Sequence, residues 1–245
     1  MALYDKFATI YQRGPYLRFS QVIVETILPE YLEELGIEPE KVLDIACGEG
    51  SFAVGMSKLG YAVTGVDQSP QMISLAKAKA QAEGEAVEFF VEDMRSLQFD
   101  NEFDLATCFF DSVNYMLTVK DLDDAFQNAY QALKPGGFYI FDMNTIFGLA
   151  VDWMRAKTYI QNEGDDFIEI HRQEYDYENQ IATMRITIFK QQGEFWERID
   201  EAHHERGYPI ADIQYLLTQM GFTIMGMYGS LRKRTEVTTN SPRVW

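Results

Sequence analysis

Five short apolar runs alternate with helix-forming segments in the first part of the chain, and this alternation limits the possible folds more than any other feature. The runs cover residues 41–46, 62–67, 87–92, 103–110 and 137–143. Strands separated by helices form parallel sheets, because parallel neighbours need long crossover connections. The pattern therefore predicts an α/β fold in which a doubly wound, mostly parallel sheet has helices on both faces.

The helices between these runs have recognisable ends. Ser69 is a favourable N-cap, Pro70 suits the first helical position, and Gly84 suits the residue after the last turn. An amphipathic helix is expected over residues 20–36, and another over 121–133. The helices that begin at Pro70 and at residue 121 thus lie between expected strands, and the helix over 20–36 precedes the first one.

After Trp153 the apolar pattern changes to a period of two. Three segments with this period cover 167–177, 180–190 and 195–204. They predict an antiparallel meander inserted into the α/β fold. A helix over 210–220 and a strand over 222–228 are then expected to rejoin the main sheet.

Two units follow from this pattern. Residues 1–150 and 207–245 are expected to form the main domain, and residues 151–206 are expected to form an inserted lid or substrate-binding subdomain. The aromatic side chains Tyr175, Tyr177 and Trp196 of the insertion are candidates for the lining of such a lid, although aromatic residues in a meander more often serve packing.

A glycine-containing loop follows the first strand, in the sequence VLDIACGEGSFA at 42–53. Gly48 and Gly50 allow a ligand to approach the backbone closely between a strand and a helix, which is typical of nucleotide cofactor sites. With Ala53 they also satisfy a dinucleotide fingerprint, so an NAD-dependent oxidoreductase remains an alternative.

Asp44 favours one cofactor over the other. A carboxylate four residues before the first glycine would repel the diphosphate of NAD, whereas the methionine end of S-adenosylmethionine (SAM) carries an ammonium and a sulfonium. Asp44 could instead cap a neighbouring loop. Charge at this position therefore favours SAM.

Acidic residues also end the next two strands. Asp67 lies nineteen residues after Gly48, a spacing that suits hydrogen bonds to the ribose hydroxyls. Asp93 is a candidate acceptor for the adenine amino group, and Met72 and Met94 are candidates to sandwich the ring. One acid at each successive strand end is the arrangement that a cofactor crevice requires.

These motifs together resemble the class I SAM-dependent methyltransferases. The resemblance covers 42–53, 65–67, 92–94, 103–115 and 133–142, roughly the first 145 residues. The later DEAHHERGY, 200–208, is similar to a small-molecule branch that includes enzymes methylating amino groups of sugars. The resemblance implies a seven-stranded Rossmann-like sheet, although only Pro242–Trp245 remains to form the last strand.

The resemblance also implies a set of cofactor-binding residues. It places Asp44, Ala46 and Gly48 at the amino-acid part of SAM, Asp67 at the ribose, and Asp93 with Met94 at adenine. It implies that aromatic residues near the N-terminus close over the cofactor. The full expected set is Tyr11, Tyr16, Asp44, Ala46, Cys47, Gly48, Gly50, Asp67, Gln68, Met72, Asp93, Met94 and Phe109.

Methyl transfer from a sulfonium is an in-line displacement that needs mainly a close, aligned and water-free acceptor. A base is needed only for a protonated acceptor. His203 and His204 must point to opposite faces of a strand, and His203 is favoured as the base. A structural role, with His203 hydrogen-bonded within the meander or to Glu205, is an equal alternative. Asn114 and Tyr115, after the fourth strand, are expected to orient the acceptor, although Asn114 also suits a turn cap.

Other possibilities remain open. Asp111, Asp142 and Asn144 end adjacent strands and could bind Mg²⁺, but loop hydrogen bonds explain them as well, so no metal is predicted. A net charge of −17 disfavours nucleic-acid substrates such as tRNA, and a protein substrate is also less favoured. A SAM-binding protein without catalysis is the remaining alternative.

Composition and patterning also bear on location and partners. No run approaches the apolar length that crosses a bilayer, and charged residues interrupt the N-terminal segment where a signal peptide would be apolar. The sequence therefore predicts a cytosolic monomer or homodimer that acts on a small polar molecule, at nitrogen or oxygen, with neither nucleic acid nor membrane as a partner.

Overall fold

The computed structural model describes Tyr4, Ala8–Tyr11 and residues 16–245. The first half contains α1 (Ala8–Tyr11), α2 (Leu17–Val22), the π-helix η1 (Ile23–Ile27), α3 (Leu28–Leu35), β1 (Lys41–Ile45), α4 (Ser51–Lys58), β2 (Ala62–Asp67), α5 (Pro70–Glu83), β3 (Glu88–Val91), the 3-10 helix η2 (Met94–Ser96), β4 (Phe103–Cys108) and the 3-10 helix η3 (Ser112–Tyr115). The second half contains α6 (Val119–Ala132), β5 (Leu133–Phe141), β6 (Met143–Asn144), the π-helix η4 (Gly148–Asp152), the 3-10 helix η5 (Trp153–Arg155), β7 (Thr158–Gly164), β8 (Phe167–Asp176), β9 (Ile181–Gln192), β10 (Phe195–Arg206), α7 (Ile210–Met220) and β11 (Arg243–Val244).

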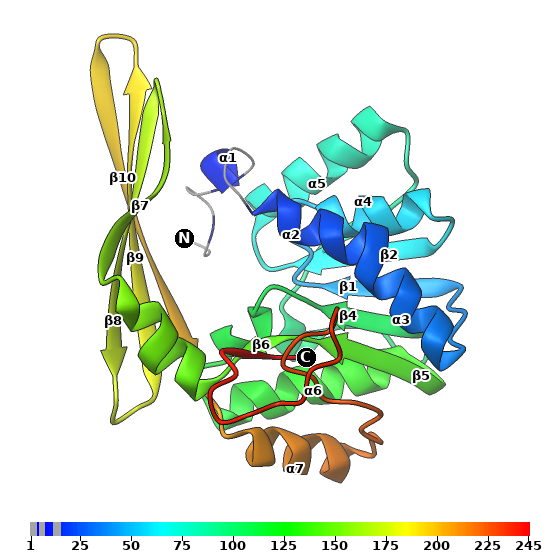
Figure 1. Ribbon diagram of the computed structural model, residues 1–245. Coiled ribbons are helices and arrows are strands. Elements are labelled where there is room, and N and C mark those ends of the chain that lie inside the picture. The colour runs from blue at the N-terminus through cyan, green and yellow to red at the C-terminus, as the bar shows by residue number, and fades with distance from the viewer. Residues whose placement is uncertain (1–3, 5–7, 12–15) are drawn as a thin grey trace.

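The predicted parallel sheet is confirmed. Its five strands lie in the order β3-β2-β1-β4-β5, and every neighbouring pair is parallel. The order along the chain reverses between β1 and β4, so the loops after these strands separate and leave a crevice at the carboxyl edge. Figure 1 shows helices covering both faces of this sheet.

Residue alternation along β1 sends side chains into two core layers. Val42 packs in the layer formed with α3, α4 and α5, and Leu43 packs in the layer formed with α6 and α7. Both side chains are fully buried. Burial on both faces explains why the parallel strands appear in the sequence as nearly unbroken apolar runs.

The helix ends agree with the sequence. The Ser69 hydroxyl accepts a hydrogen bond from the Met72 backbone N–H at the start of α5, and Gly84 ends this helix in the left-handed region. Gly36 likewise ends α3. The helix expected over 20–36 begins three residues earlier, and five of its residues form a π-helical turn.

The inserted antiparallel sheet has four strands rather than three. The additional strand is β7, which pairs with β8 on the edge opposite β10. Its sequence TYIQNEG lacks a period-two apolar pattern, because its place in the sheet depends on backbone pairing rather than on burial. Figure 1 shows this sheet standing beside the α/β domain.

The strand expected over 222–228 is absent from the structure, so the count of seven strands in the main sheet is wrong. Within this segment Tyr228 exchanges two backbone hydrogen bonds with Trp245, but no ladder with β5 forms. The short last strand is confirmed as β11, whose two residues pair with β6.

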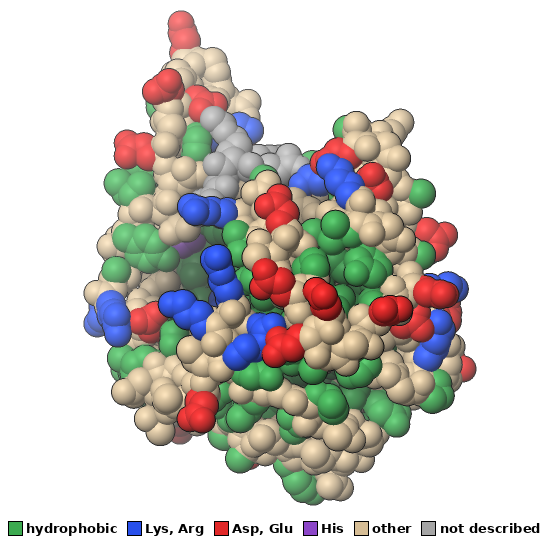
Figure 2. All heavy atoms as spheres, turned by 45° about the vertical axis from the view of Figure 1, so that its right-hand side comes forward, with side chains coloured by type: hydrophobic (Ala, Val, Ile, Leu, Met, Phe, Trp, Pro, Cys, Tyr) green, Lys and Arg blue, Asp and Glu red, His purple; other side chains and the backbone are tan. Residues whose placement is uncertain are grey.

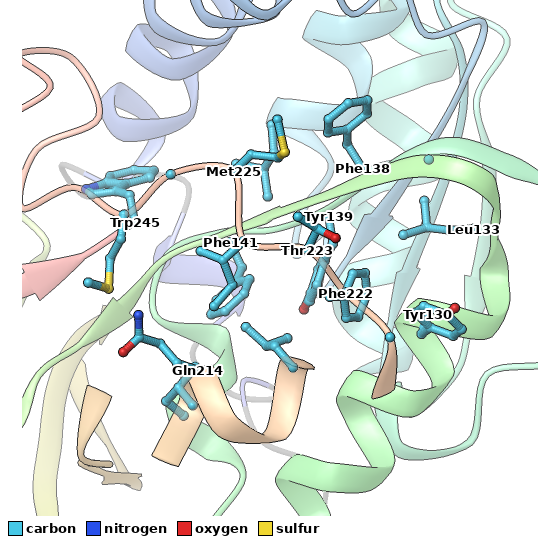
Figure 3. Close-up of a pocket in the computed structure, with 18 of the residues that line it drawn as sticks. Tyr130, Leu133, Phe138, Tyr139, Phe141, Gln214, Phe222, Thr223, Met225 and Trp245 are labelled. Carbon is cyan, nitrogen blue, oxygen red and sulfur yellow. The ribbon is translucent and has the colours of Figure 1, made fainter. Parts of the chain in front are cut away.

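An apolar cavity of about 640 Å³ lies beside β5 as a result of this missing strand. Figure 3 shows Tyr139, Phe141 and Phe222 on its wall. Among its described lining residues only Asp100 and Lys134 carry charge, and the cavity lies away from the glycine loop. We therefore assign the chemistry to the crevice instead.

Among the described residues, no helix has the length and apolar character needed to span a membrane. Figure 2 shows acidic and basic side chains on the same face of the molecule. Arg232, Lys233 and Arg234 form a cluster of basic residues in the sequence, and in the structure Arg234 pairs with Glu34 and lies over the Tyr31 ring. Cytosolic location remains a prediction.

Candidate active site

Two neighbouring cavities lie at the carboxyl edge of the main sheet. The first, which we call the crevice, is lined by residues that follow β1, β2, β3 and β4. Most of the expected cofactor-binding residues line it: Tyr11, Asp44, Ala46, Cys47, Gly48, Asp67, Gln68, Met72, Asp93, Met94 and Phe109. The structure thus brings together residues that are up to 98 positions apart in the chain.

Asp44 is the most distinctive group in the crevice. It is 3% exposed, and its Oδ1 accepts a hydrogen bond of 3.2 Å from the Thr107 hydroxyl. Its Oδ2 is buried and has no hydrogen-bond partner among the described residues. Burial, together with nearby Asp67 and Glu49, raises the pKa of Asp44 to about 8. A buried carboxylate oxygen without a partner suits a cationic ligand.

Asp67 is held in place by the backbone of the glycine loop. Its Oδ2 accepts from the Gly48 N–H at 3.0 Å, and its Oδ1 accepts from the Ser69 N–H at 2.8 Å. Each oxygen keeps a lone pair for a ligand hydroxyl. The carboxylate therefore links the loop after β1 to the loop after β2 and faces the crevice between them.

At the opposite end of the crevice, Met72 and Met94 lie with Asp93. The Asp93 carboxylate also accepts from the Arg95 backbone N–H at 2.9 Å and pairs with the Arg95 guanidinium. The side-chain bond to Arg95 lowers the pKa of Asp93. This carboxylate is consequently ionised at neutral pH and available as an acceptor, while its position is fixed by Arg95.

Two of the expected cofactor residues lie elsewhere. Tyr16 stacks on Tyr11 with ring centroids 4.6 Å apart, but its hydroxyl donates to Glu169 on the inserted sheet, so it lines the second cavity. Gly50 has φ +83°, and a Cβ there would lie 2.8 Å from the Ala76 Cβ. The close packing of α4 against α5 therefore requires a glycine at position 50.

The charge state of Asp44 predicts a pH dependence of SAM binding. Below a pKa of about 8 the carboxyl is protonated, and a cationic ligand favours the ionised form. We expect SAM affinity to rise about tenfold per pH unit between roughly pH 5.5 and 7.5, where the ligand ammonium stays protonated. Titration calorimetry at several pH values tests this slope. In Asp44→Asn the slope of the logarithm of SAM affinity against pH should fall by about one. An unchanged slope would show that ionisation of Asp44 does not govern SAM binding.

The second cavity, which we call the sheet cavity, has a volume of about 400 Å³ and lies between the crevice and the inserted sheet. Four residues line both cavities and so form their junction: Tyr4, Tyr11, Phe110 and Tyr115. Phe110 and Asp111 at this junction both adopt positive φ, a conformation that is rare for a bulky side chain.

A hydrogen-bonded chain crosses this junction. The Tyr115 hydroxyl lies 2.8 Å from the Tyr4 hydroxyl and 3.0 Å from His203 Nδ1. On the other side of the ring, His203 Nε2 lies 3.3 Å from Glu201 Oε1. His203 is buried and faces the cavity, whereas His204 is exposed, which confirms the expected opposite orientation. A carboxylate thus lies beside one nitrogen of a histidine whose other nitrogen contacts a tyrosine at the junction.

Asn114 has a different position from the one expected. Its amide nitrogen donates to the carbonyl oxygens of Asn144 and Arg206, and its oxygen accepts from the Asn144 N–H. The side chain is fully buried and lines neither the crevice nor the sheet cavity. We therefore replace the predicted acceptor-orienting role of Asn114 with a structural one, because these backbone bonds join η3 to β6 and β10.

Arg243 was not predicted from the sequence. Its guanidinium pairs with Asp111 at 2.7 Å and with Asp142. The two carboxylates considered for Mg²⁺ therefore have an arginine between them, and the geometry does not support that alternative. Burial raises the pKa of Asp142 to about 6, which the charge of Arg243 partly opposes.

The aromatic residues expected to line the inserted lid lie elsewhere. Tyr177 and Trp196 are 75% and 51% exposed. Trp153 and Tyr159, from η5 and β7, line the sheet cavity instead. The sequence carried no signal for this difference, because the path of β7 decides which aromatic rings face inward.

Comparison with known proteins gives a consistent result. Residues 42–137 match a family model described as a methyltransferase domain. A protein of Geobacillus sp. (strain WCH70) named as a methyltransferase is 31% identical over 91% of this chain and 90% of its own length. The demethylmenaquinone methyltransferase of Thermus thermophilus is 31% identical over 55% of this chain and 57% of its own.

Solved structures share the whole architecture. A SAM-dependent methyltransferase of Clostridium acetobutylicum has a TM-score of 0.83 and 27% identity, and the match covers 98% of this chain and 96% of that one. The sugar N-methyltransferase KedS8 of Streptoalloteichus sp. has a TM-score of 0.73 at 18% identity, covering 90% and 84%. The second likeness concerns the fold alone.

Proposed function

Since the chain belongs to the SAM-dependent methyltransferases, we propose that it methylates a small polar molecule, at nitrogen or oxygen, in the sheet cavity. The observation that carries this proposal is the junction between the two cavities, where Tyr4, Tyr11, Phe110 and Tyr115 line both. A cofactor in the crevice and an acceptor in the sheet cavity would meet there.

The crevice fits SAM in charge and hydrogen bonding. The unpartnered Asp44 oxygen suits a cation, the Asp67 carboxylate suits two hydroxyls, and the two methionines with Asp93 suit adenine. A dinucleotide would bring its diphosphate toward Asp44, which disfavours the oxidoreductase alternative.

When bound, SAM supplies a methyl group on a positively charged sulfur. The chain then has to exclude water and align the acceptor, which is the main contribution that a displacement reaction needs. Tyr4, Tyr11 and Phe110 form the wall that limits water at the junction. The positive charge that the acceptor gains on methylation is favoured by the carboxylates around the cavity.

The Tyr115 and His203 pair accepts the acceptor's proton in this proposal. Tyr115 is the member that lines both cavities, and His203 Nδ1 lies 3.0 Å from its hydroxyl. The proton passes from the acceptor to the Tyr115 oxygen while the Tyr115 proton passes to His203. Glu201 is a positioning residue, because its carboxylate favours the imidazolium that results.

Labelled SAM tests methyl transfer without knowledge of the acceptor. We expect the protein, incubated with methyl-labelled SAM and the small-molecule fraction of a cell extract, to give a labelled product that mass spectrometry detects. Ile186 lies on the floor of the sheet cavity, so Ile186→Trp should fill the cavity and abolish labelling while SAM binding stays unchanged.

A matched control is Thr183→Trp on the same strand, which faces away from that floor. It should retain labelling. SAM binding without any labelled product, in all fractions, would favour the alternative of a SAM-binding protein without catalysis.

A further inference from the structure

The sheet cavity is lined by more carboxylates than guanidinium groups, and by His171 and His203. Among its described lining residues the carboxylates are Asp111, Asp152 and Glu205, and the guanidinium groups are Arg155 and Arg243. Three further carboxylates do not line the cavity but bond to residues that do. Asp142 pairs with Arg243, Glu169 accepts from the Tyr16 hydroxyl, and Glu201 accepts from the Tyr4 backbone N–H. Arg155 is already paired with Asp152 at 3.2 Å, so Arg243 is the cation that faces the other carboxylates.

The acids gather beside the junction. Arg243 binds Asp111 at 2.7 Å and also Asp142, and Asp111 lies close to Glu205, where burial and then the charge of Asp111 raise the pKa of the Glu205 carboxyl. The other oxygen of Glu205 is fixed by the Asn144 amide at 2.8 Å. Glu205 is 3% exposed. One guanidinium therefore serves three carboxyls, of which Asp142 and Glu205 are buried. All three can be ionised together only if a cationic ligand adds positive charge.

Two buried acceptor oxygens on β8 have no hydrogen-bond donor among the described residues. Gln173 lines the cavity at 5% exposure, and its Oε1 has no hydrogen-bond partner among the described residues. Oε2 of Glu169, four residues earlier on the same face of β8, also has no hydrogen-bond partner among the described residues, but Glu169 does not line the cavity. A buried oxygen of this kind normally has a donor, so Gln173 Oε1, which belongs to the cavity lining, indicates a donor-bearing ligand.

Aromatic rings complete the enclosure. Trp153 and Tyr159 line the cavity with the stacked pair of Tyr11 and Tyr16. Aromatic faces and carboxylates together are the usual surroundings of a bound ammonium group. A neutral acceptor would leave Glu205 protonated, whereas an ammonium beside it would favour the ionised carboxylate and pair with it.

We propose that the sheet cavity recognises its acceptor as a cation, an organic amine whose protonated nitrogen is bound by Asp111 and Glu205. This inference rests on the proposed function, because it assigns a substrate class to the same cavity. Binding would supply the positive charge that the cluster lacks, and Gln173 Oε1 would accept a hydrogen bond from a second donor on the same molecule.

A proton exchange should accompany such binding. Burial, and then the neighbouring charge of Asp111, raise the pKa of Glu205 well above its ordinary value, so the cavity itself favours the protonated carboxyl. The charged and titratable groups near Glu205 are Asp111 from the main domain, Arg243 from β11, Tyr4 and Tyr115 at the junction, and His203, two residues away on the same face of β10. An ammonium beside Glu205 favours its ionised form, so amine binding should release a proton to the solvent.

Three shape-matched probes that differ in charge test the inference: cyclohexylamine, cyclohexanol and cyclohexanecarboxylate. Each is titrated into protein saturated with S-adenosylhomocysteine, and ligand-detected NMR measures its affinity. We expect the amine to bind at least about tenfold more tightly than the alcohol, and the carboxylate to bind most weakly. Equal affinities of all three, or no binding of the amine, would overturn the inference.

Glu205→Gln separates charge recognition from shape, because glutamine keeps the size and the bond to Asn144 but cannot ionise. It should lower amine affinity about tenfold and leave alcohol affinity unchanged. Proton release, measured as the dependence of binding enthalpy on buffer, should also disappear. Glu174→Gln, on the exposed face of β8, is the matched control and should retain both.

These outcomes remain distinct from failure of the proposed function. Loss of S-adenosylhomocysteine binding or of methyl labelling in the unaltered protein would contradict the proposed function. Retained S-adenosylhomocysteine binding with no preference for the amine would contradict only the charge assignment of the cavity.

Discussion

Asp67→Ala is expected to abolish SAM binding while the chain still folds. The carboxylate is fixed by two backbone N–H groups and faces the crevice, where it would accept two ribose hydroxyls. Two charge-assisted hydrogen bonds are together worth about 3 kcal/mol or more, so SAM affinity should fall at least about 100-fold. The thermal shift that SAM produces in the unaltered protein should vanish.

Three comparisons make this result specific. The melting temperature measured without SAM shows how far the loss of the hydrogen bonds from the Gly48 and Ser69 N–H groups lowers the stability of the fold itself. Asp67→Asn keeps one acceptor oxygen and should retain part of the shift. Asp123→Ala removes an exposed carboxylate on α6 and should change nothing. A full SAM shift in Asp67→Ala would show that this residue does not bind the ribose.

His203→Ala is expected to lower the turnover number by a factor on the order of 10² to 10⁴, the usual contribution of a positioned base. The side chain contacts Tyr115 but does not line the crevice, so SAM affinity should not change. The test measures the rate at which S-adenosylhomocysteine is released in the presence of the acceptor that the labelling experiment identifies.

The pH profile distinguishes a base from a packing residue. Raising the pH should restore part of the His203→Ala turnover, because the acceptor then loses its proton to the solvent. Tyr115→Phe should show a similar loss with unchanged SAM affinity. His204→Ala, one residue away on the exposed face, is the matched control. Equal turnover of His203→Ala and the unaltered protein near neutral pH would exclude this role.

Strong local patterns made most of the main domain predictable. The strands from β1 to β5 are apolar runs bounded by glycine, proline and capping residues, and a chain that alternates them with helices has few ways to bury both. The acids Asp67 and Asp93 were identified for the same reason, because each ends or follows such a strand, and Asp44 was identified by its position in β1 four residues before Gly48.

The failures involve long-range pairing. Strand β7 has no apolar pattern of its own, and it was missed because only its hydrogen bonds to β8 make it a strand. The segment 222–228 has a strand-like composition and lies beside the edge strand β5, but it forms no ladder with β5, so it was wrongly assigned. Composition measures how well a segment would fit a sheet, and it cannot measure whether the segment pairs with a neighbouring edge.

By itself the sequence determined the parallel sheet, the glycine loop and the acidic residues of the crevice, because these depend on residues close together in the chain. Only the tertiary structure decided the contents of the sheet cavity. Tyr4, Arg243 and Glu205 come from the two ends of the chain and from the insertion, and they reach one cavity through strand pairing and side-chain packing. Their charges act on one another only after folding brings them together in a buried space, which is why local sequence did not reveal them.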